Sequence, residues 1–203
     1  MFPGTVDVVV VGARCAGAAT AMLLARAGRS VLLVDRGDYG SDILSTHALM
    51  RGGVLQLARW NLLGRIIEAG TPPVKTTTFH LGDEKVHVPI KPKFGVDALY
   101  APRRTVLDRV LVDAAEQSGA LVRFGTRLTG LSRGSDGGVD GVVLQDRAGR
   151  SVQVTAKHVV GADGMRSTVA GLVGAPVYRS GRHATAVLYG YWPDLPVDGY
   201  NWH

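Results

Sequence analysis

A glycine-rich turn between an apolar run and a helix-forming stretch constrains the fold of this chain more than any other feature. The segment from Val6 to Arg36 reads VDVVVVGARCAGAATAMLLARAGRSVLLVDR. The β-branched run before Gly12 is typical of a parallel strand that is buried on both faces. Alanines and leucines after Gly17 favour a helix, and Gly28 suits its left-handed end. The segment therefore predicts a strand, a tight turn, a helix and a second strand ending at Asp35.

The turn and the acid have the spacing of a nucleotide-binding unit. Gly12 turns the chain, and Gly17 allows the helix to pack closely against the strand. The first amides of that helix can bind a pyrophosphate, and we expect a side chain at Gly12 to block the approach of the ligand. Asp35 stands 18 residues beyond Gly17, where a carboxylate can accept hydrogen bonds from both hydroxyls of an adenosine ribose.

Arg14 departs from the G-x-G-x-x-G fingerprint, because it occupies the place of the middle glycine. Its charge can compensate for a less close approach of the backbone to the pyrophosphate. The alternative is a structural βαβ unit with an empty turn. The strand before the turn, the helix after it and the acid at the expected distance favour the nucleotide site.

The composition indicates a globular protein with enough apolar residues for a core. The chain has 203 residues and a formal net charge of +6, but its charges are scattered, so we expect no nucleic acid as a main partner. No run of about 20 uncharged apolar residues predicts a transmembrane segment. The single cysteine, Cys15, excludes an intramolecular disulfide and favours a cytoplasmic location. We expect it to be buried, with a reactive thiol as the alternative.

A polar loop and a helical stretch follow the second strand. Apolar residues from Leu55 to Ile67 have helical spacing, which we expect to break near Gly64 and end at Gly70. The loop before them lies near the carboxyl edge of the sheet, where open α/β sheets bind ligands. Its candidate ligand residues are Ser45, Thr46, His47 and Arg51. For His47 the alternative is a helix-capping role, whereas Arg51 is a candidate phosphate contact.

An antiparallel hairpin interrupts the βαβ order. Residues 71–92 alternate between apolar and polar around a turn at Gly82 and Asp83, and prolines bracket them. This pattern predicts an excursion into a second sheet, to which we also assign a strand at 183–192. His80 and His87 lack the spacing of a metal-ligand set, so we expect no metal site.

A second helix returns the chain to the first sheet. The apolar spacing from Val106 to Ala115 predicts a helix that Gly119 ends, and residues 121–124 predict a strand. Arg103 and Arg104 stand at the helix start, where cations are unfavourable unless an anion is near. They are therefore ligand candidates, with two solvated arginines as the alternative.

A β-meander and a final strand complete the pattern. Three alternating runs, at 128–132, 139–144 and 151–155, predict the meander. Apolar residues at 159–160 predict a further, buried strand, which leads to Asp163 and Gly164 at the sheet edge that also holds Gly12. We expect these two residues to face the same ligand.

The order of these motifs resembles the group A flavoprotein monooxygenases, which have the aromatic-hydroxylase fold, and the related geranylgeranyl-reductase-like FAD oxidoreductases. The likeness covers about residues 5–175 and rests on the glycine turn, the R-x-x-L-D-x-x-L pattern from Arg104, the meander and the segment GADGMRSTV. It implies an α/β fold: a Rossmann-like FAD-binding domain (GR2-type) with a β-meander, at 1–70 and 98–176. Part of a second antiparallel substrate sheet would occupy 71–97 and 177–203.

The resemblance also implies FAD as the cofactor and NAD(P)H as the electron donor. The residues that it and the sheet-edge argument place at the cofactor are Gly12, Ala13, Arg14, Ala16, Gly17, Asp35, Arg36, His47, Arg51, Arg104, Asp163 and Gly164. The implied activity is monooxygenation of a hydrophobic or aromatic small molecule. Alternatives are reduction of prenyl double bonds, more distantly halogenation, or a truncated, non-catalytic FAD-binding domain. The flavin carries the chemistry, so we name no catalytic acid or base.

The family has a second glycine-aspartate motif far downstream, which this chain does not reach before His203. We therefore expect the chain to be the N-terminal half of a longer protein. An incomplete second sheet would expose an unpaired edge and an apolar face. Expressed alone, the chain is expected to aggregate or form oligomers, to bind FAD weakly and to show no turnover.

Overall fold

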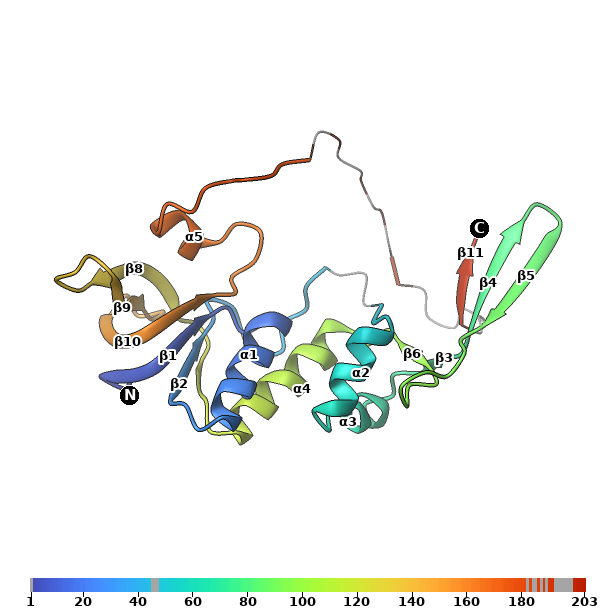
Figure 1. Cartoon of the computed structure of the whole chain (residues 1–203), viewed down its shortest axis with the longest axis horizontal. Coiled ribbons are helices and arrows are strands. Elements are labelled where there is room, and N and C mark those ends of the chain that lie inside the picture. Colours follow the sequence, from blue (N-terminus) through green and yellow to red (C-terminus); the bar gives the residue numbers. More distant parts are fainter. Residues whose placement is uncertain are drawn as a thin grey trace. The chain divides into compact units, whose positions relative to one another are not determined.

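The computed structural model describes residues 2–44, 48–181, 183, 186, 188, 190, 191 and 199–203 (Figure 1). The chain forms two compact units, Met1–His47 with Pro102–Ala175 (unit 1) and Ala48–Ala101 with Pro176–His203 (unit 2). The domain bounds expected from the sequence stay a prediction. Within the described ranges, no helix combines the length and the apolar character that crossing a membrane requires.

Unit 1 is built on a six-stranded mixed sheet with the order β7-β2-β1-β10-β9-β8. The strands are β1 (Thr5–Val11), β2 (Val31–Val34), β7 (Leu121–Arg123), β8 (Arg127–Arg133), β9 (Val139–Gln145) and β10 (Ser151–Gly161). Neighbours from β7 to β10 pair in parallel, and β9 pairs antiparallel with both β10 and β8. This mixed α/β sheet confirms the predicted fold class, with its Rossmann-like parallel part and its meander.

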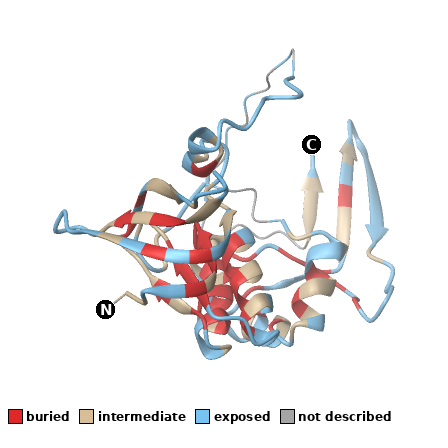
Figure 2. Cartoon of the chain, turned by 60° about the vertical axis from the view of Figure 1, so that its left-hand side comes forward, coloured by how far each residue is buried: buried red, intermediate tan, exposed pale blue. Residues whose placement is uncertain are grey.

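Helices α1 (Cys15–Arg26) and α4 (Arg104–Gln117) pack against each other beside this sheet (Figure 1). The buried residues of α1 include Gly17, Ala18, Ala21 and Met22, so small side chains let the helix lie close to β1 and β2. Both predicted helix ends are confirmed, because Gly28 and Gly119 take positive φ values of 74° and 101°. Figure 2 shows the buried residues gathered in these helices and the central strands.

Strand β10 is one continuous strand, whereas we expected two. Its first part pairs antiparallel with β9, from Ser151 opposite Gln145 to Thr155 opposite Gly141. Its second part pairs in parallel with β1, from Thr155 to Gly161. The polar residues between the two expected strands form no loop, because the same strand changes partners there and Lys157 forms an ion pair with Asp7 on β1.

Unit 2 contains two short helices and two small sheets. Its elements are α2 (Arg51–Arg59), α3 (Leu63–Glu68), β3 (Pro73–Val74), β4 (Thr76–Leu81), β5 (Glu84–Pro89), β6 (Leu99–Tyr100) and β11 (Tyr200–Trp202). The predicted hairpin is confirmed, because β4 and β5 pair antiparallel around Gly82, whose φ is 62°. The helix break expected near Gly64 lies slightly earlier in the chain. The break lies at Asn61, which has a φ of 61° and separates α2 from α3.

The three-stranded sheet of unit 2 has the order β11-β4-β5. Strand β11 pairs in parallel with β4, Tyr200 opposite Thr77. It lies in the range 177–203, which we expected to belong to a second sheet, but we expected that sheet to be antiparallel. The strand expected at 183–192 falls on a stretch in which 184, 185, 187, 189 and 192 lie outside the described residues, so it stays a prediction. Every residue of β5 is exposed (Figure 2).

Candidate functional site

The glycine turn joins β1 to α1 at the carboxyl edge of the parallel strands. Gly12 has a φ of 103°, and a Cβ there would lie 2.7 Å from the carbonyl carbon of Ala162. A Cβ on Gly17 would overlap the carbonyl oxygen of Gly12, which confirms the predicted close packing of helix on strand. The expectation for Gly12 needs correction, because a side chain there meets the protein's own backbone before any ligand is considered.

The first turn of α1 receives no cap from the side chain of its N-cap residue. Its N-cap residue is Arg14, which makes no side-chain cap hydrogen bond, and the first turn holds no acidic residue. The helical hydrogen bonds begin where the amide of Ala18 donates to the carbonyl of Arg14 at 2.8 Å. The amides before Ala18 can therefore bind an anion, which the positive end of the helix dipole favours.

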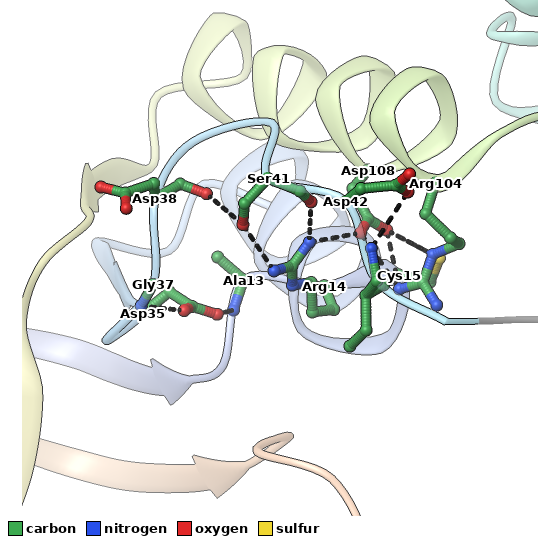
Figure 3. A network of polar contacts seen from close by, with 11 residues as sticks. Ala13, Arg14, Cys15, Asp35, Gly37, Asp38, Ser41, Asp42, Arg104 and Asp108 are labelled. Carbon is green, nitrogen blue, oxygen red and sulfur yellow. Dashed lines mark hydrogen bonds and ion pairs between the residues drawn. The ribbon is translucent and has the colours of Figure 1, made fainter.

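Asp35 connects the end of β2 to the glycine turn (Figure 3). Its Oδ2 accepts a hydrogen bond from the Ala13 amide at 2.8 Å, and its Oδ1 accepts one from the Gly37 amide at 2.7 Å. Each carboxylate oxygen has a second lone pair. The acid can therefore hold the turn in place and still accept a hydrogen bond from a ligand hydroxyl.

The side chain of Arg14 contacts the protein itself. Its Nη1 donates to the Ser41 carbonyl at 2.7 Å and to Asp108 Oδ2 at 3.0 Å. Its Nη2 donates to Ser41 Oγ at 2.8 Å. The residue that replaces the fingerprint glycine therefore ties the turn to the loop after Asp35 and to α4 (Figure 3).

Asp108 is the centre of these contacts, and sequence reasoning did not include it among the site residues. It is only 2% exposed, and it accepts hydrogen bonds from Nε and Nη2 of Arg104 at 2.9 to 3.1 Å. The Cys15 thiol donates to its Oδ1 at 3.1 Å. Two guanidinium groups around one carboxylate leave a net positive charge beside the turn. The aspartate of the R-x-x-L-D pattern was the signal that could have identified it.

Cys15 is held as a neutral thiol. Burial, together with the charge and the hydrogen bond of Asp108, raises the pKa of Cys15 to about 12. A thiolate would be buried next to a carboxylate, so the charged form is disfavoured at neutral pH. The alternative of a reactive Cys15 therefore finds no support in this geometry.

Asp163 and Gly164 follow β10 at the edge that holds Gly12. Val11 pairs with Gly161, so β1 and β10 end together, as predicted. Asp163 lies at the start of α5 (Thr168–Leu172), whose N-cap is Ser167. Its Oδ2 accepts hydrogen bonds from the Thr168 and Val169 amides at 2.5 and 3.3 Å. Its Oδ1 accepts one from Ser167 Oγ at 2.6 Å. Gly164 has a φ of 85°, which a residue with a side chain rarely adopts.

The remaining candidates occupy different surroundings. Ala16 is exposed in the first turn of α1. Arg36 is exposed after β2 and lines an open hollow of about 330 Å³ together with Arg127 and Arg147. Arg51 begins α2 in unit 2 and donates to the Val96 carbonyl at 3.2 Å. Residues 45–47, which include the predicted His47, lie outside the described residues. Their place at the cofactor stays a prediction.

Comparison with known proteins supplies independent findings. A family described as "FAD binding domain" matches residues 5–195. The chain is 33% identical over 185 residues to a menaquinone reductase of Mycolicibacterium smegmatis. The aligned region covers 89% of this chain and 43% of that protein. It is 30% identical over 192 residues to a tetracenomycin B2 monooxygenase-dioxygenase of Streptomyces olivaceus, covering 81% and 35% of the two chains.

A solved structure shares the fold. PqsL of Pseudomonas aeruginosa, in complex with 2-aminobenzoylacetate, superposes with a TM-score of 0.73 at 23% identity, over 87% of this chain and 48% of that chain. This chain therefore spans less than half the length of the relatives that it matches. The family match over residues 5–195 includes the glycine turn, α4 and β10.

Proposed function

Because this chain belongs to the FAD binding domain family, we propose that the turn between β1 and α1 holds the pyrophosphate of FAD and that Asp35 holds its adenosine ribose. The observation that carries this proposal is the 2.8 Å hydrogen bond from the Ala13 amide to Asp35 Oδ2. This hydrogen bond fixes the turn, where we expect the pyrophosphate, relative to Asp35, which we expect to bind the ribose. A ligand containing adenosine diphosphate requires both groups in one rigid arrangement.

The residues present fit FAD. The first turn of α1 offers amides without a side-chain cap, and the guanidinium groups of Arg14 and Arg104 outnumber the single carboxylate of Asp108. Among the described residues, Nη1 of Arg104 has no hydrogen-bond partner. A doubly charged pyrophosphate is complementary to this charge and to these donors.

The activity of the complete protein follows as a proposal. FAD supplies the redox chemistry when it is bound, and this chain supplies the residues that bind and orient its adenosine end. We propose an NAD(P)H-dependent oxidoreductase, with monooxygenation of a hydrophobic or aromatic small molecule as the leading reaction. The similarity to a tetracenomycin B2 monooxygenase-dioxygenase supports it.

A second reaction has support of its own. The 33% identity to a menaquinone reductase favours a reductase, for which we propose reduction of a prenyl double bond. The two reactions differ in their need for oxygen. NAD(P)H oxidation by the full-length protein that depends on both oxygen and a substrate would support monooxygenation, and substrate-dependent oxidation without oxygen would support the reductase.

The binding site is tested by titration of the purified protein with FAD, ADP and FMN. ADP is expected to compete with FAD, whereas FMN is not, because the proposed contacts are with the adenosine end. Asp35→Asn should weaken FAD binding by about 1.5–3 kcal/mol, the scale of a hydrogen bond to a charged group. Asp136→Asn is a matched control, because the carboxylate of Asp136 also accepts a hydrogen bond from a backbone amide. The donor is the amide of Gly138, at 2.9 Å, in an exposed turn. Unchanged FAD affinity in Asp35→Asn, or competition by FMN alone, would show that the site is elsewhere.

A further inference from the structure

One buried carboxylate connects helix α4 to the glycine turn of unit 1. Asp108 on α4 accepts hydrogen bonds from Arg14 in the glycine turn, from Cys15 at the start of α1 and from Arg104 on its own helix. Its side chain is 3% exposed, whereas those of Arg14 and Arg104 are 26% and 15% exposed. The ionised form of a carboxylate that is so deeply buried is stable only while its cationic partners are present.

Arg14 extends this connection to the loop that follows Asp35. It donates to both the carbonyl and the hydroxyl oxygen of Ser41. The same loop is attached to α4 at two further points, where Tyr39 donates to Asp113 Oδ1 at 2.6 Å and Asp42 pairs with Arg103. The guanidinium of Arg14 therefore lies between Asp108 on α4 and the loop after Asp35 (Figure 3). This loop also contacts α4 directly.

We propose that Asp108 is a positioning residue for the nucleotide site: it holds Arg14 across the glycine turn and against Ser41, so that the turn and Asp35 are in place before the ligand binds. This inference rests on the proposed function. The contacts of the Arg14 side chain with Asp108 and Ser41, which we call the clamp, thus accompany the replacement of the fingerprint glycine by Arg14. Preorganisation of this kind raises affinity, because the ligand does not have to order the site.

A role of Asp108 through charge alone and a role in positioning Arg14 predict opposite changes in anion affinity for Asp108→Asn. This difference makes the proposal testable. Asp108→Asn removes the carboxylate that pairs with both Arg14 and Arg104, and the net positive charge near the pyrophosphate increases. If Asp108 acted only through charge, the variant would bind an anion more tightly. If Asp108 positions Arg14, the two guanidinium groups repel each other, the contact with Ser41 loosens and affinity falls.

The experiment measures ADP affinity by titration calorimetry in folded apoprotein. Asp108→Asn is expected to weaken ADP binding on the order of tenfold or more, the scale of coupling within a charged network. Glu116→Gln is the matched control, because it removes one negative charge from the exposed surface of the same helix and should leave the affinity within about twofold. Equal or tighter ADP binding by Asp108→Asn would overturn the inference.

A second variant covers the case in which Asp108→Asn does not fold. Arg14→Gly restores the fingerprint glycine, and it should also weaken ADP binding, because the clamp is lost. In a double-mutant cycle, Asp108→Asn should cost less in the Arg14→Gly background than in the wild type. Additive effects, or tighter binding by Arg14→Gly, would count against the clamp.

The Cys15 thiol reports on the same network without any nucleotide. Its reaction with a disulfide reagent should be faster in Asp108→Asn than in the wild type, because the variant removes the negative charge next to the thiol that disfavours the thiolate. An unchanged rate would show that the network does not form. Failure of the wild type to bind ADP would overturn the proposed function and this inference with it. Wild-type binding with an unaffected Asp108→Asn would overturn this inference alone.

Discussion

Gly17 lies against the carbonyl oxygen of Gly12 so closely that a Cβ at residue 17 would overlap this oxygen. The contact joins the first turn of α1 to the end of β1, and neither partner is a flexible side chain that could move away. The glycine is therefore required by the packing of the helix on the strand. Ligand binding depends on this packing, because it directs the amides of α1.

Gly17→Ala is expected to lower the free energy of unfolding by about 1–3 kcal/mol or more, the cost of overpacking a rigid site. Gly52→Ala is the control, because Gly52 lies in helix α2 with open space around it. Alanine there should leave stability equal or higher by about 0.5–1 kcal/mol. Urea denaturation measures both values, and a Gly17→Ala protein as stable as the wild type would contradict the close contact.

Asp163→Ala is expected to destabilise the protein by about 0.5–2 kcal/mol, because the amides of Thr168 and Val169 in the first turn of α5 lose their acceptor. Asp163→Asn, which keeps one acceptor oxygen, should have an intermediate effect. Thermal unfolding measures these changes, and FAD titration of the same variants separates two roles. Full stability with lost FAD affinity would mean that Asp163 acts on the cofactor rather than as a helix cap.

Asp7 is expected to make stability depend on pH. Its hydrogen bonds from Lys157, the larger cause, and from Ser30 hold the pKa of Asp7 below its ordinary value of 3.8. The folded pKa is depressed, so the stabilisation is present above the unfolded pKa and is lost as the pH falls below about 3.8. Asp7→Asn should be less stable than the wild type at pH 7, and the difference should narrow in acid.

Urea midpoints between pH 7 and pH 2.5 measure this narrowing. The stability difference between the wild type and Ser30→Ala should also narrow in acid, but it should be smaller. The reason is that the hydroxyl of Ser30 donates to Asp7 Oδ2 at 2.8 Å. A gap between the wild type and Asp7→Asn that stays constant with pH would show that Asp7 has the same proton affinity in the folded and unfolded chain.

The Cys15 thiol should react slowly in the folded protein. Its pKa is raised from 9.0 to about 12, so the thiolate fraction at pH 8 is about a thousandfold smaller than that of an ordinary thiol. Reaction with a disulfide reagent should be fast in urea and slow in native buffer. Rapid reaction of the native protein at pH 8 would contradict the contact with Asp108.

Local features of the sequence were sufficient for the βαβ unit. The β-branched run of β1, the small residues of α1 and the glycines at 12, 17 and 28 act on neighbours close in the chain, and their conformations follow from backbone sterics and periodicity. The hairpin around Gly82 was predictable for the same reason. Its turn and its alternation lie within one short stretch.

Long-range pairing decided what sequence reasoning missed. Strand β10 pairs with β9 at one end and with β1 at the other, and β11 forms only because it pairs with β4, far earlier in the chain. Such partners lie many residues apart, so no local pattern indicates where one strand ends. The helix break lies at Asn61, which has a positive φ, a few residues before Gly64, near which we expected it.

The candidate site divides in the same way. The sequence alone determined the glycine turn, the acid at Asp35 and the family to which these motifs belong, because each depends on residue type and spacing within one unit. Only the tertiary structure decided that Asp108, 94 residues from Arg14, holds that arginine and Arg104 together. A buried carboxylate chooses its partners by distance and desolvation in three dimensions, and neither of these quantities is encoded in spacing along the chain.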